Sequence, residues 1–214
     1  RVRDWGSARL RLLHRVGLWY HADYDARGLP VGARLPNVEL DRGRRIVDYL
    51  DGEGLLFERD VRKGAPMPMD ALTAFHDLSY LERVTWPDKL ASIFGLHGAD
   101  VDVDTILRAQ RRAAGGTLSA ATWALESTER RAFNLGGGFH HAERESGSGF
   151  CIYNDVGASI DRLRRDGFDG RIAIVDLDYH QGNGNSVAFA DDASVFTYSL
   201  HGAVWTQSES QNNL

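Results

Sequence analysis

The chain has 214 residues, 43% hydrophobic and 26% charged, a composition typical of a globular protein with one domain or two small ones. The formal net charge of -5 argues against a broad nucleic-acid-binding face, and no apolar run approaches the length of a membrane span. The single cysteine, Cys151, excludes an intrachain disulfide and fits a reducing compartment, so we expect a cytoplasmic protein. Cys151 itself is expected to be a small buried apolar residue rather than a reactive thiol.

The N-terminal quarter predicts one short strand, a helix and a second strand. The chain begins with Arg1 rather than Met, so we expect it to be processed or cut from something longer. The arginine-rich opening resembles a transit peptide, but its composition favours a solvated leader. A strand is predicted over 16–20, a loop over 21–25, an irregular Gly/Pro-rich segment over 26–37, a helix over 40–50 that Gly52 and Gly54 terminate, and a strand over 55–57.

Two helical patterns occupy the middle of the chain. After a loop over 62–68, residues 69–84 predict a helix whose second part Asp77 caps. His76 and Tyr80 lie one helical turn apart there, a spacing more typical of packing than of chemistry. Residues 104–126 give the longest helical pattern. It contains Gly115 and Gly116, which are costly in a helix, so we expect another backbone to approach them closely.

The C-terminal half alternates strands with helices. Strands are predicted over 132–135, 171–176 and 194–200, and helices over 154–165 and 186–190. The strand over 171–176 contains the continuous apolar run IAIV, as expected when both faces of a strand are covered. The alternation indicates a parallel α/β sheet, and ligands of such sheets bind beyond the carboxyl ends of the strands.

One such strand end carries the stretch GGGFHHAERESGSGFCIYND, residues 136–155. Neighbouring side chains on a strand point to opposite faces, so aiming His140 and His141 into one pocket requires irregular backbone, which glycine permits. The alternative is a glycine-rich surface turn with two solvated histidines. The window alone does not choose between these interpretations.

The next strand end reads DLDYHQGNG from Asp176 to Gly184. Asp178 and His180 share one face if the backbone is extended, and a carboxylate with an imidazole suits Zn²⁺. A catalytic zinc site needs three protein ligands and an open position. His21, His97 and His201 are all possible third ligands, and their spacing selects none of them.

Histidines that move protons need a partner on the other ring nitrogen to fix the tautomer. Asp176 and Asn183 are the nearby candidates for His140 and His141. Two imidazoles beside a metal-bound water could then act as general base and general acid.

Together these motifs resemble the histone deacetylase family, which includes the bacterial acetylpolyamine amidohydrolases. The resemblance runs from about Leu18 to His201 through GGGFHHA, GFCIYND, IVDLDYHQGNG and VFTYSLH, with HDLSYLERV and the helix containing Gly115 as further matches. The HQGNG, APMPMD and SLHGA forms resemble the class IV-like bacterial branch. The resemblance implies a three-layer α/β/α sandwich of the arginase/deacetylase type with a mainly parallel sheet. Residues 1–214 would form a single domain, about the N-terminal two-thirds of the family domain.

The resemblance also implies residue roles and a reaction. Zinc would polarise an acetyl-lysine-type amide and activate a water, and the products would be acetate and a free amine. The substrate would be an acetylated lysine peptide, a polyamine or a small acetylated amine, with no nucleic acid or membrane as partner. By position, the roles are zinc ligands Asp178 and His180; proton-handling His140 and His141, backed by Asp176 and Asn183; channel wall Gly149 and Phe150; a structural potassium site at Asp176, Asp178, His180, Ser199 and Leu200; and a second monovalent cation near Phe189 and Val195.

The family also requires an aspartate as third zinc ligand and, in most members, a tyrosine that stabilises the oxyanion. No residue fills either role by motif, and the segment after Ala203 matches the family poorly, although Trp205 could serve as a channel wall. Three hypotheses follow: part of a zinc-dependent deacetylase, a truncated chain that binds acyl-lysine or a partner without turnover, or another arginase-like metallohydrolase. The HHA, GFC and DLDYHQGNG motifs argue against the last.

Overall fold

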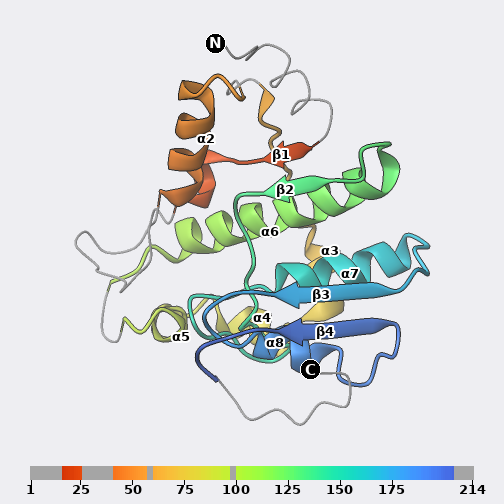
Figure 1. Cartoon of the computed structure of the whole chain (residues 1–214). Coiled ribbons are helices and arrows are strands. Elements are labelled where there is room, and N and C mark those ends of the chain that lie inside the picture. Colours follow the sequence, from red (N-terminus) through yellow and green to blue (C-terminus); the bar gives the residue numbers. More distant parts are fainter. Residues whose placement is uncertain (1–15, 26–40, 57–59, 97–99, 205–214) are drawn as a thin grey trace, which may run out of the picture. The chain divides into compact units, whose positions relative to one another are not determined.

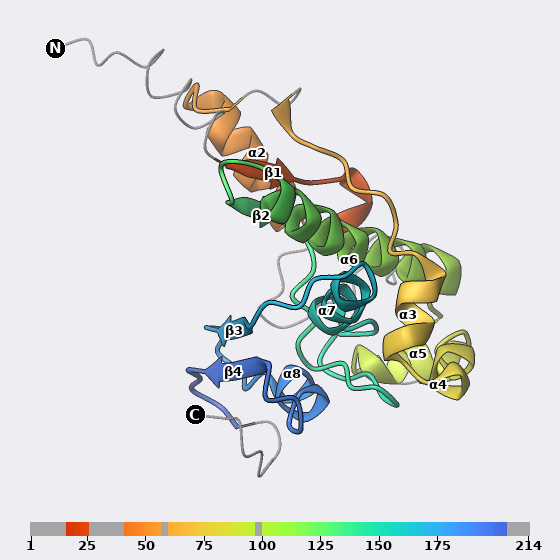
Figure 2. The ribbon, with the colours of Figure 1, turned by 90° about the vertical axis from the view of Figure 1, so that its right-hand side faces the viewer.

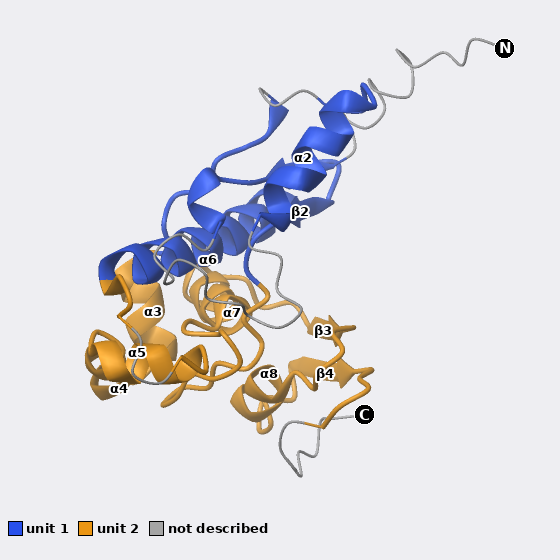
Figure 3. Cartoon of the chain, turned by 90° about the vertical axis from the view of Figure 1, so that its left-hand side faces the viewer, with its two compact units in different colours: residues 1–67, 104–137 blue, residues 68–103, 138–214 orange. Residues whose placement is uncertain are grey.

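The computed structural model describes residues 16–25, 41–56, 60–96 and 100–204 (Figure 1). Several predictions lie outside these ranges: those for leader residues 1–15, the irregular segment 26–37, Phe57, His97 and Trp205. The contacts divide the chain into two compact units, one of residues 1–67 and 104–137 and the other of residues 68–103 and 138–214 (Figure 3). The prediction of one domain over 1–214 stays a prediction. None of the described helices has the length and apolar character needed to cross a membrane.

The first unit contains a two-stranded parallel sheet. Strand β1 (Gly17–Trp19) pairs with β2 (Ala132–Asn134), and the unit also holds the 3-10 helix η1 (Ala22–Tyr24) and helices α2 (Arg42–Gly52) and α6 (Val103–Glu126). The predicted strands at 16–20 and 132–135 and the helices at 40–50 and 104–126 are therefore confirmed within one to two residues at each end. The strand predicted over 55–57 was wrong for Leu55 and Leu56, which belong to no strand.

Gly115 of α6 lies against backbone, as expected, whereas a Cβ atom on Gly116 would meet the side chains of Tyr24 and Asn134. A Cβ atom on Gly115 would collide with the carbonyl oxygen of Ala65 and the backbone nitrogen of Met67. A Cβ atom on Gly64 would lie 2.9 Å from Cα of Gly116. At Gly115 the helix thus accepts the cost of glycine because the segment before α3 runs directly across it.

The second unit contains the remaining helices and a second two-stranded parallel sheet (Figure 2). Strand β3 (Ile172–Asp176) pairs in register with β4 (Val195–Ser199), and helix α8 (Asn183–Ala188) contacts β4. Helix α7 (Asp155–Arg165) packs against α3 (Met69–Phe75), where a Cβ atom on Gly157 would collide with the ring of Phe75. The remaining helices are α4 (Leu78–Arg83) and α5 (Pro87–Ile93).

The prediction of one helix over 69–84 was wrong in its middle. His76 and Asp77 have extended backbone dihedrals and separate α3 from α4, and the Asp77 side chain makes no capping hydrogen bond. Helix α5 was not predicted, although its Pro87 at the first turn is a recognised start signal. Helix α8 begins at Asn183, three residues before the predicted start.

Strand β3 differs from the prediction that both of its faces are covered. Its burial alternates, and Ala173 and Val175 are exposed, the latter at 61%. Phe196 of β4 is 42% exposed. Among the described residues, nothing covers this face of the sheet. The apolar run therefore predicted the strand correctly, but the prediction that both of its faces are buried was wrong. The described strands pair as two separate sheets rather than as one ladder.

Candidate functional site

The glycine-rich loop after β2 holds the two histidines rigidly. Asp155, at the start of α7, is fully buried, and its carboxylate accepts hydrogen bonds from the backbone N–H groups of Gly138 (2.9 Å) and Phe139 (2.7 Å). Gly138 has a φ of +76°, a conformation that favours glycine. His140 and His141 are both buried, with ring centroids 4.1 Å apart, so the structure excludes a solvated surface turn.

A buried asparagine fixes the loop on its other side. The side chain of Asn154 donates to the carbonyl oxygen of Ala142 (2.9 Å) and to Asn185 (3.0 Å), and its own oxygen accepts from the N–H of Gly157 as the cap of α7. Its backbone N–H donates to Nε2 of His76 over 3.0 Å. His76 and Tyr80 pack with ring centroids 5.4 Å apart, as the sequence predicted.

His140 is oriented by a carboxylate. Its Nδ1 lies 2.7 Å from Oδ2 of Asp176, at the end of β3, and both side chains are about nine-tenths buried. Burial opposes ionisation of Asp176, but the hydrogen bonds from His140 and from the Asp178 backbone N–H outweigh it, so the pKa of Asp176 lies below its ordinary value. A carboxylate accepts only, so neutral His140 carries its proton on Nδ1.

His141 is oriented by an amide. Its Nδ1 lies 2.6 Å from Oδ1 of Asn183, the first residue of α8, and Asn183 is 1% exposed. Burial lowers the pKa of His141; the hydrogen bond to Asn183 opposes this, and His140 and His180 add to the lowering. At any pH above 6.5, the ordinary pKa of histidine, His141 is therefore neutral.

Gly149 lies beside the ring of His141, and both Gly149 and Phe150 have left-handed backbone, which is unusual for Phe150 but not for a glycine. Their φ angles are +52° and +67°, and a Cβ atom on Gly149 would collide with the ring of His141. Phe150 packs near Phe94, with ring centroids 6.0 Å apart. Cys151 is buried, as expected, and burial raises the pKa of its thiol to about 12.

The structure brings Asp178 and His180 close to the histidine pair, but not by the predicted route. The chain bends after β3, and Oδ1 of Asp178 accepts from the N–H of His180 over 2.7 Å, so the assumption of extended backbone was wrong. Nδ1 of His180 lies 3.4 Å and Nε2 of His140 lies 3.8 Å from that same oxygen.

The donor set fits Zn²⁺ in part. A carboxylate and an imidazole nitrogen are the right donor types, but within the described ranges no three His, Cys, Asp or Glu side chains form a group that could hold a metal. His21 instead caps η1 by accepting from the N–H of Asp23, and His201 bonds Ser199 over 2.9 Å. His97 lies outside the described residues.

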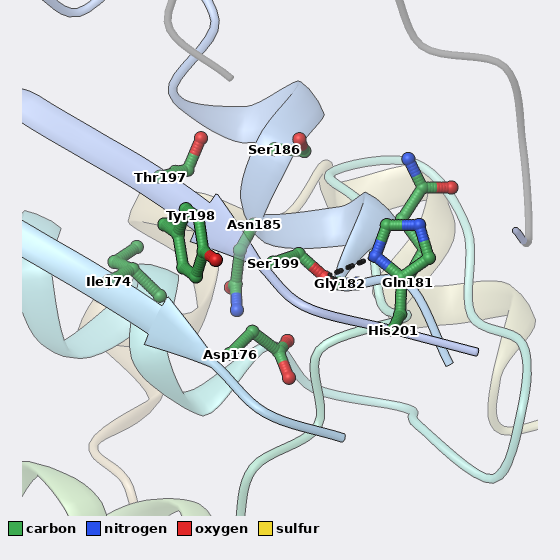
Figure 4. A pocket seen from close by; sticks show the side chains of 10 residues that line it. All are labelled: Ile174, Asp176, Gln181, Gly182, Asn185, Ser186, Thr197, Tyr198, Ser199 and His201. Atoms are coloured by element: carbon green, nitrogen blue, oxygen red, sulfur yellow. Dashed lines mark hydrogen bonds between the residues drawn. The ribbon is translucent and has the colours of Figure 1, made fainter. Parts of the chain in front are cut away.

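Behind Asp176 lies a cavity of about 120 Å³ (Figure 4). Asp176 lines it from β3 and Ser199 from β4, while Gln181, Gly182 and His201 line it near the bend after β3. Of the residues predicted for potassium, Asp176 and Ser199 line this cavity, whereas Asp178, His180 and Leu200 do not. Phe189 and Val195 are both buried.

Sequence patterns did not single out two residues that support the site. Glu143 accepts a hydrogen bond from Nδ2 of Asn183 over 2.8 Å, and Asn154 links the histidine loop to α7. Asn154 precedes a helical pattern, which is a cap signal. Glu143 has no comparable signal, because its partner lies 40 residues away.

Comparison with solved structures defines the class of fold. An HDAC homologue complexed with SAHA matches with a TM-score of 0.71 and 28% identity, over 87% of this chain and 51% of that one. An HDAC homologue from Aquifex aeolicus matches with a TM-score of 0.67 and 25% identity, over the same shares of the two chains. The fold is therefore the mixed α/β fold of histone deacetylase homologues, as the sequence predicted.

The sequence comparison gives the family. The histone deacetylase domain matches residues 37–208, and the chain belongs to the histone deacetylase family. Histone deacetylase 8 of Xenopus tropicalis is 35% identical over 170 residues, 75% of this chain and 45% of that protein. The acetoin utilization protein AcuC of Bacillus subtilis is 42% identical over 87 residues, 41% of this chain and 22% of that protein. The chain thus spans less than half the length of these relatives.

Proposed function

We propose that this chain forms part of a hydrolase that removes acetyl groups from lysine-type amines, releasing acetate and the free amine. The observation that carries the proposal is the pair of buried histidines, whose Nδ1 atoms lie 2.7 Å and 2.6 Å from side-chain oxygens of Asp176 and Asn183. Neutral rings held in this way carry the proton on Nδ1 and keep the Nε2 lone pair for proton transfer. Membership of the family supports the same class of reaction.

Asp178 and His180 are the proposed protein ligands of one Zn²⁺, with the third ligand outside the described residues. When bound, the ion would polarise the substrate carbonyl and lower the pKa of an attacking water. We also assign a structural K⁺ to the region of Asp176, Asp178, His180, Ser199 and Leu200, and a second monovalent cation to the carbonyls near Phe189 and Val195. The oxygen atoms around the cavity behind Asp176 support only the Asp176 and Ser199 part of that assignment.

The histidines divide the proton transfers. His141, neutral because burial lowers its pKa, takes a proton from the attacking water at Nε2. It returns that proton to the amine nitrogen as the amide bond breaks, so no net proton stays on the protein. His140, held by the Asp176 carboxylate, orients the water. Gly149 and Phe150 would line the acyl-lysine channel beside His141.

The proposed substrates are acetylated lysine peptides, acetylated polyamines or small acetylated amines. The relatives whose names contain histone deacetylase support the first of these. The second candidate function is binding of an acyl-lysine or a partner without turnover. The incomplete donor set of the described residues and the 53% exposure of the Asp178 side chain favour it for the 214-residue chain alone.

One assay separates the two candidates. Purified chain with added Zn²⁺ is incubated with an acetyl-lysine peptide and with an acetylated polyamine, and acetate is measured against a His141→Ala variant and an exposed control, Asp169→Ala. Acetate release that His141→Ala abolishes and Asp169→Ala preserves supports the hydrolase. Binding of the peptide without acetate release supports the second candidate. Sequencing the coding DNA past the Leu214 codon would then show whether an aspartate ligand and a tyrosine follow in frame.

A further inference from the structure

We infer that Glu143 is a positioning residue: it fixes the orientation of the Asn183 amide and thereby keeps the proton of His141 on Nδ1. Asn183 bridges the other two side chains. Its Nδ2 donates to Oε1 of Glu143 over 2.8 Å, and its Oδ1 lies 2.6 Å from Nδ1 of His141. The catalytic consequence rests on the proposed function, whereas the orientation itself does not.

An amide next to a histidine is ambiguous in a way that a carboxylate is not. An asparagine can present either its oxygen, which accepts, or its NH₂ group, which donates. The first choice requires the proton of the neutral imidazole on Nδ1, and the second requires it on Nε2. His140 is free of this ambiguity because Asp176 can only accept.

Glu143 removes the ambiguity at His141. Its carboxylate accepts only, so the NH₂ group of Asn183 must face Glu143 and the oxygen must face His141. The reversed amide would set its carbonyl oxygen against the carboxylate. Asn183 is 1% exposed, so water could not compensate for the lost hydrogen bond.

The loop holds Glu143 in position for this role. Its backbone N–H donates to the carbonyl oxygen of Ser146 over 2.8 Å, and the preceding residue, Ala142, accepts from Asn154 over 2.9 Å. Both polar groups of the peptide unit between Ala142 and Glu143 are therefore hydrogen-bonded, which fixes the backbone immediately before the carboxylate side chain. In the proposed reaction, the locked tautomer keeps the lone pair on Nε2 of His141, as a base requires.

The tautomer is measured directly by two-bond ¹H–¹⁵N correlation spectra of chain labelled with ¹⁵N-histidine. The spectra are recorded at pH 7.5 with EDTA, and His141 is assigned by loss of its signals in His141→Phe. We expect His141 of the wild type to be a single Nδ1–H tautomer. Glu143→Gln keeps the size of the side chain but can donate as well as accept. The preference for one orientation of the Asn183 amide should then weaken by about one net hydrogen bond. We therefore expect the share of the Nε2–H tautomer to rise about fivefold or more.

Two further variants make the outcome specific. Glu145→Gln removes an exposed carboxylate two residues away and should leave the tautomer unchanged. Adding Asn183→Asp to Glu143→Gln restores an obligatory acceptor beside Nδ1 and should restore the single Nδ1–H tautomer. An unchanged tautomer in Glu143→Gln, or an equal change in Glu145→Gln, would overturn the inference. The readout does not depend on acetate release, so failure of the proposed function would leave it standing.

Discussion

The backbone N–H of Asn154 donates to Nε2 of His76 over 3.0 Å, although 78 residues separate them in the sequence. This bond requires a lone pair on Nε2, so His76 is neutral in the folded protein. Burial lowers the pKa of His76 from 6.5 to about 4; the carbonyl groups of Arg144 and Glu143 oppose the shift. Among the described residues, its Nδ1 has no hydrogen-bond partner.

A neutral buried histidine makes stability depend on pH. Below pH 6.5 the unfolded chain binds a proton at His76 that the folded chain does not bind until about pH 4. This contribution to stability is therefore complete above pH 6.5 and falls as the pH drops toward 4, by about 3 kcal/mol in total. Urea unfolding between pH 4 and 8 measures it. In His76→Gln the free energy of unfolding should depend less on pH than in the wild type. His21→Gln, which changes a half-buried ring, should retain the wild-type dependence. Equal pH dependence in the wild type and both variants would contradict the assignment.

Gly149→Ala should both strain the backbone and displace the ring of His141. The positive φ costs about 1–2 kcal/mol for a residue with a Cβ atom, and the collision with the His141 ring adds to it. Gly138→Ala is the matched control, because Gly138 has a φ of +76° but nothing within 4 Å of the added atom. We expect a larger loss of unfolding free energy in Gly149→Ala and a shift of the His141 ring resonances in that variant alone. Similar shifts in both would show that the contact is unimportant.

Gly115→Ala should destabilise the first unit by about 3 kcal/mol, because the added methyl group meets the backbone at Ala65 and Met67, which cannot rotate away. Gly52→Ala places the same change in helix α2 with nothing within 4 Å, and it should be neutral or stabilise by up to about 1 kcal/mol. Thermal and urea unfolding of both variants test this. Wild-type stability of Gly115→Ala would contradict the close approach of residues 65–67 to helix α6.

Asp178→Ala should remove most of the zinc that the protein holds after dialysis against a zinc buffer, because Asp178 is one of two proposed ligands in the described part of the chain. Metal content by mass spectrometry of the eluted protein measures it. Asp169→Ala, an exposed aspartate in another loop, should retain the wild-type content. An unchanged zinc content in Asp178→Ala would refute its assignment as a ligand.

Local patterns predicted the elements that depend on local chemistry. The apolar spacing of 104–126 and the β-branched run of 171–176 specify a helix and a strand before any tertiary contact forms, and both are present. The break at His76 was not predictable in this way, because the extended backbone there is stabilised by partners distant in sequence: Asn154 at Nε2 and the Arg144 carbonyl at the N–H of Asp77.

The sequence by itself determined which chemical groups this protein brings to its strand ends: the tandem histidines, Asp176, Asp178 and His180, in motifs that identify the family. Only the tertiary structure decided which atoms meet. Asp176 pairs with His140, and Glu143 orients Asn183 behind His141, through hydrogen bonds that span 36 and 40 residues. A sequence pattern reports short-range backbone preference, whereas the direction of a hydrogen bond depends on where the folded chain places each donor and acceptor.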